Sequence, residues 1–321
     1  MGEIRTLALA DVARLLGVTP ESVHAACPAG LPATLRYQRL SASEEAEVVA
    51  RVEQQLASAA PPPAGPQRHG RWEEGWSENL IAIRREGFRA ELLAPRYFRP
   101  DVLRLGGEYV RPLTATFELD LFAVLRRVLF ALYCADVDTV VELGCGTGAN
   151  LLALVEQLPQ VRAIGCDWAR SSQELLRAAA EATGCDLRGV HFDMFHPERA
   201  EPLPIGPRTA VLTVHALEQL GGRWEQVFDY VLRRAPRRCV HLEPLLELYD
   251  GTPHDQRAAA YHRQRNYLDG YLTALRARAA AHDLRVVTEH RVRFGSLFHE
   301  AYSFVVWEPL RQATEAAAAY G

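Results

Sequence analysis

The sequence contains no lysine: all 36 basic residues of the 321-residue chain are arginines, and 40 acidic residues bring the formal net charge to -4. The absence of lysine excludes a lysine Schiff base and a lysine general base from any mechanism of this chain. The slightly negative charge gives no reason to expect binding to nucleic acid or to an anionic membrane.

Paired cysteines and long apolar runs are also missing. The six cysteines are scattered without a C-x-x-C pair, which favours neither a zinc site nor a disulfide framework and suits a reducing cytoplasm. The longest apolar stretch, 119–135, is interrupted by Arg126 and Arg127 and is too short to span a bilayer. The first residues lack the basic and apolar regions of a signal peptide. We therefore expect a cytoplasmic location.

Composition and patterning divide the chain into five segments. They are a small all-α domain at 1–58, a proline-rich linker at 59–70, a mostly helical segment rich in aromatic residues and arginine at 71–136, a domain of alternating strands and helices at 137–310, and a flexible alanine-rich tail at 311–321.

The N-terminal segment has the spacing of a helix-turn-helix. A short helix at 11–16 is followed by Gly17, and Thr19-Pro20-Glu21 then opens a second helix with a cap and a proline at its first position. However, the second helix, 21–27, contains no arginine, and a DNA reader needs basic contacts to phosphates. The segment is better interpreted as a dimerisation or peptide-docking module, or as packing for the rest of the chain. We expect a homodimer.

The most informative stretch is 140–148, Val-Val-Glu-Leu-Gly-Cys-Gly-Thr-Gly. The apolar run 137–143 predicts a buried parallel strand, and a helix follows the glycines. Glycines at such a strand-to-helix turn remove the Cβ atoms that would keep a ligand away from the backbone. Glu142, two positions before the first glycine, is placed to bind a ligand's amine.

The next two predicted strands also end in acidic residues. The strand at 162–167 ends in Asp167, roughly twenty residues past the glycine loop, where a ribose-binding acid is expected. The strand at 189–193 ends in Asp193, followed by two apolar residues. The glycine stretch, with these acids behind it, resembles motif I and the following strands of the class I S-adenosylmethionine (SAM) dependent methyltransferases.

The resemblance implies SAM as the cofactor and S-adenosylhomocysteine as its product. It implies that Glu142 lies near the methionyl amine, that Asp167 binds the ribose, and that Asp193 reaches the adenine amino group. The cofactor-binding residues that it implies are Glu142, Gly144, Gly146, Gly148, Asn150, Asp167, Trp168, Asp193, Met194, Phe195 and Val214.

The pattern after residue 137 predicts an α/β fold with a parallel sheet and helices on both faces. Further strands are predicted at 209–214, 238–242, 285–294 and 301–307, with one long helix at 255–282. Seven strands ending in a hairpin, with the last strand inserted antiparallel, resemble the Rossmann-like class I methyltransferase sheet. The glycines also satisfy G-x-G-x-x-[G/A], but a plain dinucleotide-binding domain lacks that ending, which disfavours an NAD-dependent oxidoreductase.

The catalytic candidates are His215 and Glu243, because ligands of open α/β sheets bind at the carboxyl ends of the strands. His215 has a suitable unperturbed pKa for a general base; its alternative role is a hydrogen bond to the backbone or to SAM. Glu243 is expected to point into the mouth of the site. The candidate substrate-binding residues are Trp76, Tyr109, Arg111, Glu218, Tyr261, Arg265 and His299. No candidate pair has H-x-x-x-H or E-x-x-H spacing, so we predict no metal site.

These features predict an enzyme that transfers a methyl group from SAM to a small polar molecule, such as an amino acid or a natural-product intermediate. The acceptor atom, oxygen, nitrogen or carbon, stays open. One alternative is a methyltransferase acting on a peptide substrate that residues 1–58 dock. An alternative of another class is a non-catalytic SAM-binding regulator.

Overall fold

The computed structural model describes residues 2–58, 61–95 and 101–310. The predicted tail, 311–321, and the first two residues of the predicted linker lie outside this part of the chain. Within it, no helix is long and apolar enough to cross a membrane.

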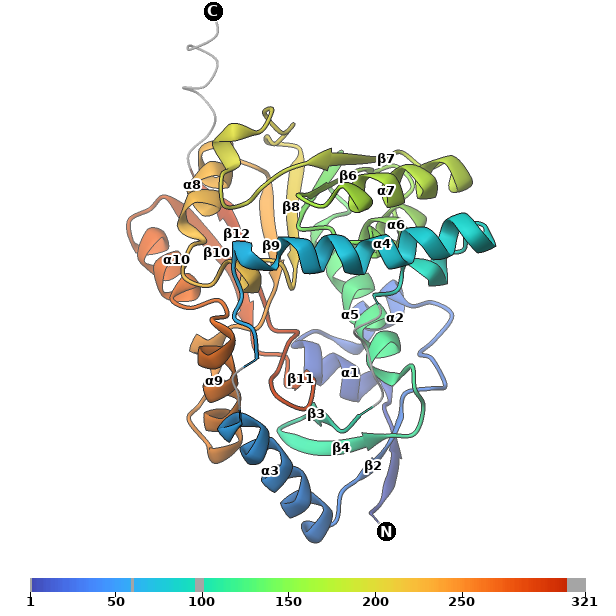
Figure 1. The fold of residues 1–321 in the computed structure, drawn as a ribbon, viewed down its shortest axis with the longest axis vertical. Coiled ribbons are helices and arrows are strands. Elements are labelled where there is room, and N and C mark those ends of the chain that lie inside the picture. Colours follow the sequence, from blue (N-terminus) through green and yellow to red (C-terminus); the bar gives the residue numbers. More distant parts are fainter. Residues whose placement is uncertain (1, 59–60, 96–100, 311–321) are drawn as a thin grey trace, which may run out of the picture.

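A seven-stranded sheet forms the centre of the molecule (Figure 1), in the order β10-β12-β9-β8-β5-β6-β7. Its strands are β5 (Thr139–Leu143), β6 (Arg162–Asp167), β7 (Leu187–His191), β8 (Thr209–Val214), β9 (Arg238–Leu242), β10 (Leu284–His290) and β12 (Phe304–Pro309). Strands β5 to β9 run parallel, and β12 is antiparallel to both β9 and β10. The predicted seven-stranded sheet with an inserted antiparallel last strand is therefore confirmed.

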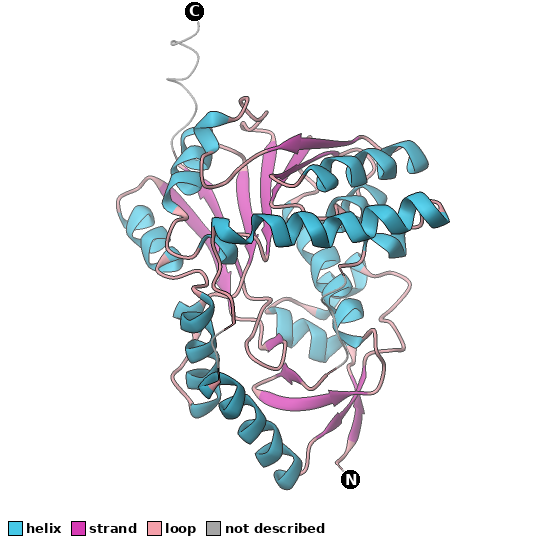
Figure 2. Ribbon diagram, viewed as in Figure 1, coloured by secondary structure: helices cyan, strands magenta, loops and turns pink. Residues whose placement is uncertain are grey.

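Helices cover both faces of this sheet, as Figure 2 shows. Neighbouring residues of β5 point to opposite faces, so Val140 belongs to one hydrophobic cluster and Val141 to the other. The first cluster packs against α5 (Phe117–Tyr133), α6 (Ala149–Gln157) and α7 (Arg170–Thr183), and the second against α8 (Glu225–Arg233) and α10 (Tyr271–Ala280). The short 3-10 helices are η1 (Pro66–Arg68), η2 (Ala90–Leu93), η3 (Pro197–Arg199), η4 (Leu217–Leu220) and η5 (Leu246–Leu248).

The single long helix predicted at 255–282 is wrong. The structure has two helices here, α9 (Pro253–Arg265) and α10. Asn266 ends α9 in the left-handed region at φ 49°, and Gly270 precedes α10 at φ 74°. Asparagine and glycine adopt this conformation at the lowest cost, so the break is encoded locally.

A second sheet, of five strands, lies below the first in the view of Figure 1. Its strand order is β1-β2-β4-β3-β11. It is formed by β1 (Ile4–Thr6), β2 (Arg36–Arg39), β3 (Leu103–Leu105), β4 (Glu108–Pro112) and β11 (Phe294–Gly295). Strands β1 to β4, which lie before residue 137, were not predicted from the sequence. The segment 1–58 is therefore mainly helical rather than all-α, and 71–136 carries two strands besides its helices.

The N-terminal helices are α1 (Leu9–Leu16), α2 (Pro20–Ala26) and α3 (Ala42–Ala57). Thr19 caps α2 by accepting a hydrogen bond from the Ser22 N–H, as its sequence predicts. Buried residues of α1 and α2, among them Val12 and Val23, belong to the same hydrophobic cluster as α5. The N-terminal helices are thus packed into the body of the molecule.

Candidate active site

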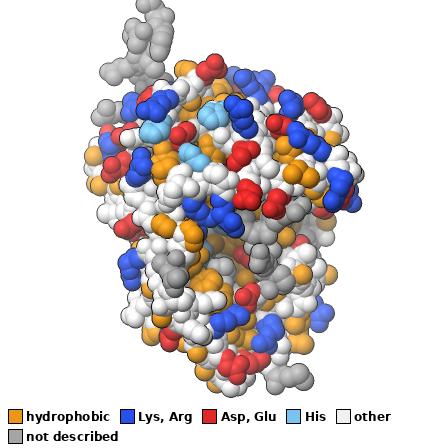
Figure 3. All heavy atoms as spheres, in the orientation of Figure 1, with side chains coloured by type: hydrophobic (Ala, Val, Ile, Leu, Met, Phe, Trp, Pro, Cys, Tyr) orange, Lys and Arg blue, Asp and Glu red, His pale blue; other side chains and the backbone are white. Residues whose placement is uncertain are grey.

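A cavity of about 1020 Å³ lies at the carboxyl ends of β5, β6 and β8, beneath α4 (His69–Glu86) and beside α5. In the space-filling view the surface is hollowed below α4, with basic and hydrophobic side chains at the rim (Figure 3). The predicted residues that line the cavity are Trp76, Gly144, Gly146, Asn150, Asp167, Trp168, Asp193, Met194, Phe195, Val214, His215, Glu218, Tyr261, Arg265 and His299. Glu142, Gly148, Glu243, Tyr109 and Arg111 do not line it.

The glycine loop forms one wall of the cavity. Gly144 and Gly146 have φ values of 72° and 54°, which side chains disfavour. A Cβ at Gly144 would lie 2.5 Å from the Cβ of Ala216, and one at Gly146 would lie 3.0 Å from the indole of Trp76. Gly148 instead packs against Leu176, where a Cβ would lie 2.6 Å from a side-chain methyl group. Two of the three glycines therefore shape the cavity, and the third lets Leu176 of α7 pack closely against the loop.

Asp167 and Asp193 lie on the same wall. The Asp167 carboxylate accepts hydrogen bonds from the Gly146 and Ala169 N–H groups, both at 2.9 Å, and so ties the glycine loop to the end of β6. Burial raises the pKa of Asp167 to about 6 despite these bonds. Asp193 accepts from the Phe195 N–H at 2.8 Å. Each carboxylate oxygen keeps a second lone pair for a ligand hydroxyl or amine.

Glu142 lies behind the loop rather than on the cavity wall. Asn150 donates to its Oε1 at 2.8 Å, while Oε2 is buried without a hydrogen-bond partner in the described part of the chain. Burial raises the pKa of Glu142 to about 8. The contact with a ligand amine that the resemblance implies for Glu142 therefore stays a prediction, because the carboxyl group does not reach the cavity.

Arg126 also lines the cavity, although it was not among the predicted site residues. Its guanidinium donates to Asn150 Oδ1 at 3.2 Å, so Arg126, Asn150 and Glu142 form a chain of hydrogen bonds. Burial lowers the pKa of Arg126 to about 10. The signal was present, because this arginine interrupts an otherwise apolar helix, and a charge on such a face needs a partner or a ligand.

His215 follows β8 in the left-handed conformation, at φ 51°. Its ring lies near those of Phe122 and Tyr302, with a centroid distance of 4.9 Å to Tyr302. Nε2 is buried and has no hydrogen-bond partner within the described residues. Burial lowers the pKa of His215 to about 4, and a hydrogen bond with the Ala301 backbone opposes this shift. The ring is therefore neutral near pH 7, and it is a weaker base than an exposed histidine.

Glu243 does not point into the mouth of the site, and that prediction is wrong. Its carboxylate is fully buried and accepts hydrogen bonds from three consecutive N–H groups after β8, those of Ala216, Leu217 and Glu218, at 3.0, 3.0 and 3.2 Å. These buried N–H groups need a hydrogen-bond acceptor, and the carboxylate is a stronger acceptor than water. Glu243 therefore holds the turn that carries His215 and Glu218.

Tyr109 and Arg111 also lie away from the cavity, because they belong to β4 rather than to a helical lid. The Tyr109 hydroxyl accepts from Arg104 at 3.2 Å, and Arg111 forms an ion pair with Glu44 at 2.7 Å. Both predictions failed because the second sheet was not expected.

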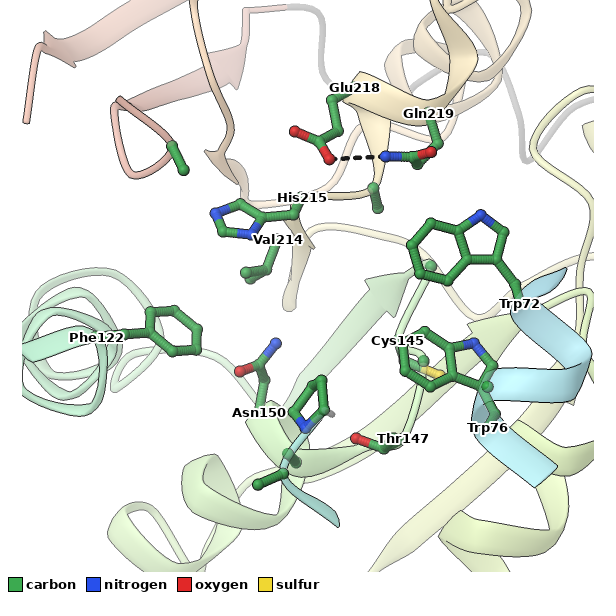
Figure 4. Close-up of a pocket in the computed structure, with 18 of the residues that line it drawn as sticks. Trp72, Trp76, Phe122, Cys145, Thr147, Asn150, Val214, His215, Glu218 and Gln219 are labelled. Carbon is green, nitrogen blue, oxygen red and sulfur yellow. Dashed lines mark hydrogen bonds between the residues drawn. The ribbon is translucent and has the colours of Figure 1, made fainter. Parts of the chain in front are cut away.

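Figure 4 shows how the cavity walls face one another. Trp72 and Trp76 project from α4 on one side, with stacked rings whose centroids lie 5.4 Å apart. His215 and Glu218 come from the turn after β8, and Phe122 comes from α5. Gln219 donates to Glu218 Oε1 at 2.7 Å, and burial, followed by the nearby Glu243, raises the pKa of Glu218 to about 8.

Several wall residues carried no motif in the sequence. Trp72, Glu118, Phe122 and Tyr302 line the cavity from three distant segments. No group of three histidine, cysteine or acidic side chains able to hold a metal ion occurs in the described part of the chain.

Comparisons with known proteins point to one family. Residues 140–235 match the family described as methyltransferase domain. Trans-aconitate 2-methyltransferase of Azoarcus sp. (strain BH72) is 51% identical over 57 residues, which is 18% of this chain and 21% of that protein. The chain thus matches about a fifth of the length of this curated relative.

Two solved structures are also similar. An O-methyltransferase from neocarzinostatin biosynthesis shares 17% identity at a TM-score of 0.41, covering 95% of this chain and 90% of that one. A SAM-dependent methyltransferase from Aquifex aeolicus shares 14% identity at a TM-score of 0.40, covering 58% and 88%. Likenesses this distant carry no conclusion about substrate or assembly.

The matched stretch contains the glycine loop, both strand-end aspartates and the turn after β8. It also lies in a sheet whose last strand is inserted antiparallel between two others. Residues 140–235 are therefore similar to the methyltransferase domain family.

Proposed function

We propose that this chain transfers the methyl group of SAM to a small polar metabolite. The observation that carries the proposal is one continuous cavity lined by two unlike groups of residues. One group is the glycine loop with the strand-end aspartates, and the other is a group of polar and aromatic side chains around Arg265. A methyltransferase needs both in one enclosure, because donor and acceptor must meet in line.

The residues around the glycine loop suit SAM. The absence of a Cβ at Gly146 lets Trp76 lie against the loop, and Asp167 has lone pairs left for ribose hydroxyls. When bound, SAM supplies a methyl group already activated by its sulfonium. The work left to this chain is to orient the acceptor and to exclude water.

The acceptor needs little help from a base. His215 lines the cavity, and its lowered pKa makes it a weak base. Glu243 is occupied by backbone N–H groups. An acceptor that is already nucleophilic, such as a carboxylate or a neutral amine, suits this environment better than a hydroxyl. The short stretch shared with a protein named trans-aconitate 2-methyltransferase agrees with a small polar acceptor.

Residues 1–58 are proposed to complete the fold rather than to dock a peptide. Their helices contribute buried side chains to the cluster around α5, and Gln264 of α9 donates to the Leu56 carbonyl of α3 at 2.6 Å. A docking module would keep an apolar surface uncovered. The homodimer and a role in natural-product biosynthesis stay predictions.

The test begins with the affinity of the purified protein for S-adenosylhomocysteine, measured by calorimetry. We expect binding in the wild type and an affinity at least about tenfold weaker in Asp167→Ala, a loss of about 1.4 kcal/mol. SAM labelled in its methyl group is then incubated with the protein and an extract of the source cells. Label in small molecules supports the proposal. Label on peptides redirects it to the docking alternative, and tight binding without any transfer favours a regulator.

A further inference from the structure

The cavity is also lined by Tyr261, Arg265, Tyr267 and His299, here called the acceptor subsite. The first three come from α9 and the turn after it, and His299 comes from the loop after β11. Arg265, Tyr267 and His299 are each only 8% exposed. This is a built, water-poor pocket rather than a patch of surface charge.

The positive charge of Arg265 is not matched by an acid. No carboxylate of the described residues lies within ion-pair distance of its guanidinium. Nη1 donates to the Pro62 carbonyl at 2.6 Å and Nη2 donates to the Tyr267 hydroxyl at 3.1 Å, while Nε is buried without a partner. Since a guanidinium has five N–H groups, three are left for a ligand. A buried cation without an anion is unfavourable, which points to an anionic ligand.

His299 adds a further polar group on the same wall. Its Nδ1 lies 2.9 Å from Nε2 of His262, so its Nε2 is the nitrogen available to a molecule in the cavity. Burial, followed by the neighbouring histidines and arginines, holds the pKa of His299 well below its usual range. Burial likewise lowers the pKa of His262 to about 3. The pair is therefore neutral near pH 7, and one proton is shared between the facing nitrogens.

Glu218 is an acidic residue near this subsite, and a negative charge on it would offset the positive charge of Arg265. Its Oε1 accepts a hydrogen bond from Gln219, and its raised pKa of about 8 keeps the carboxyl protonated near pH 7. Arg68 donates to Gln219 Oε1 at 3.1 Å and brings a second cation to this side. The balance of charge around the subsite is positive, although the whole chain is negative.

We propose that Arg265 and His299 bind a carboxylate of the methyl acceptor, so that the substrate is a carboxylic acid held in the acceptor subsite. A guanidinium pairs with a planar carboxylate through parallel hydrogen bonds. The stacked rings of Tyr261 and Phe298, 4.8 Å between centroids, give the pocket a flat wall. One arginine and one neutral imidazole match a single negative charge better than a phosphate dianion. This inference rests on the proposed methyltransferase function.

The test separates the extract before the transfer reaction. Metabolites are bound to a strong anion exchanger at neutral pH, and carboxylic acids are eluted with acid while phosphates stay bound. Each fraction is incubated with the wild-type protein and methyl-labelled SAM. We expect the label in the carboxylic acid fraction. Label only in the phosphate fraction, or only in unbound molecules that mass spectrometry shows to have no carboxylate, would overturn the inference and leave the methyltransferase function intact. Absence of label from every fraction, or of S-adenosylhomocysteine binding, would overturn the proposed function itself.

Variants of the subsite residues are then assayed, with the fraction that accepted the label as substrate. Arg265→Met and His299→Gln should each raise KM about 10- to 100-fold, with affinity for S-adenosylhomocysteine unchanged. The KM of Arg265→Lys should lie between those of the wild type and of Arg265→Met, because lysine keeps the positive charge but not the planar guanidinium group. Arg276→Met and His282→Gln, at exposed positions, are the controls. Arg265 also donates a hydrogen bond to the Pro62 carbonyl, so Arg265→Met could unfold the protein. In that case the KM of His299→Gln tests carboxylate binding. Loss in kcat alone, with KM unchanged, would contradict carboxylate binding here.

Discussion

The indole of Trp76 lies directly against Gly146, so closely that a Cβ at this glycine would come within 3.0 Å of the ring. Gly146 also donates its N–H to Asp167. Helix α4, the glycine loop and the end of β6 therefore meet at one residue without a side chain, and the space for a ligand depends on it.

Gly146→Ala should weaken binding of S-adenosylhomocysteine by about tenfold or more. The φ of 54° costs an L-residue about 1–2 kcal/mol, and the added methyl group displaces Trp76. Calorimetric titration measures the effect. Gly206→Ala is the matched control, because a Cβ there meets nothing within 4 Å. Equal affinities in the two variants would show that the ligand does not use this loop.

Glu243→Gln should lower stability and perturb the cavity at the same time. Glutamine offers one acceptor oxygen and turns an amide N–H₂ toward backbone donors, so at least one buried N–H loses its partner. Each such loss costs about 1–3 kcal/mol. Urea denaturation should show this decrease, whereas Glu289→Gln, at a partly exposed ion pair, should change little. A fully stable but inactive Glu243→Gln would instead restore Glu243 as a catalytic candidate.

Arg291 holds a buried ion-pair network beside α9. It pairs with Glu300 at 2.6 Å and with Asp255 at 2.7 Å, and both acids are almost completely buried. Arg291→Met leaves two carboxylates without their cation, which should cost about 3–5 kcal/mol of unfolding free energy. Arg276→Met removes an exposed pair and should cost less than about 1 kcal/mol. Comparable losses in the two variants would contradict the buried network.

Glu118 should make stability depend on pH. Burial raises its pKa from 4.5 to about 7, while the Tyr302 hydroxyl donates to it at 3.0 Å. The folded state therefore holds the proton more tightly than the unfolded state, so this contribution is complete below 4.5 and is lost as the pH rises through about 7. Melting temperatures measured without ligand should fall less between about pH 5 and pH 8 in Glu118→Gln than in the wild type. Parallel curves would rule this out.

The parts of the fold that the sequence predicts are those with local signals. Strands β5, β6 and β8 are continuous apolar runs, and the glycines and strand-end acids are read directly from neighbouring residues. Strands β2 and β4 are short and pair across distant positions, as Tyr37 does with Pro112. No local pattern marks such a pairing, and Tyr109 and Arg111 were misplaced for this reason.

The site shows the same division. The prediction that Glu243 points into the mouth of the site was wrong, because a sequence pattern does not show that three N–H groups of another segment lie within hydrogen-bond distance of its carboxylate. Phe122 and Tyr302 meet in the cavity from α5 and from the approach to β12, 180 positions apart by their numbering. Such meetings follow from tertiary packing, which a single sequence does not reveal.

The segment between the N-terminal helices and α4 is fastened to the end of α9. Arg265 donates to the Pro62 carbonyl, and its own carbonyl accepts from the Ala64 N–H at 2.6 Å. The composition of this segment is that of a flexible linker, but the segment is held in place by hydrogen bonds to Arg265, whose side chain lines the cavity. A chimera that replaces the N-terminal segment by that of another protein must therefore keep residues 62–64. Without their hydrogen bonds to Arg265, the replacement would change the cavity although it lies outside it.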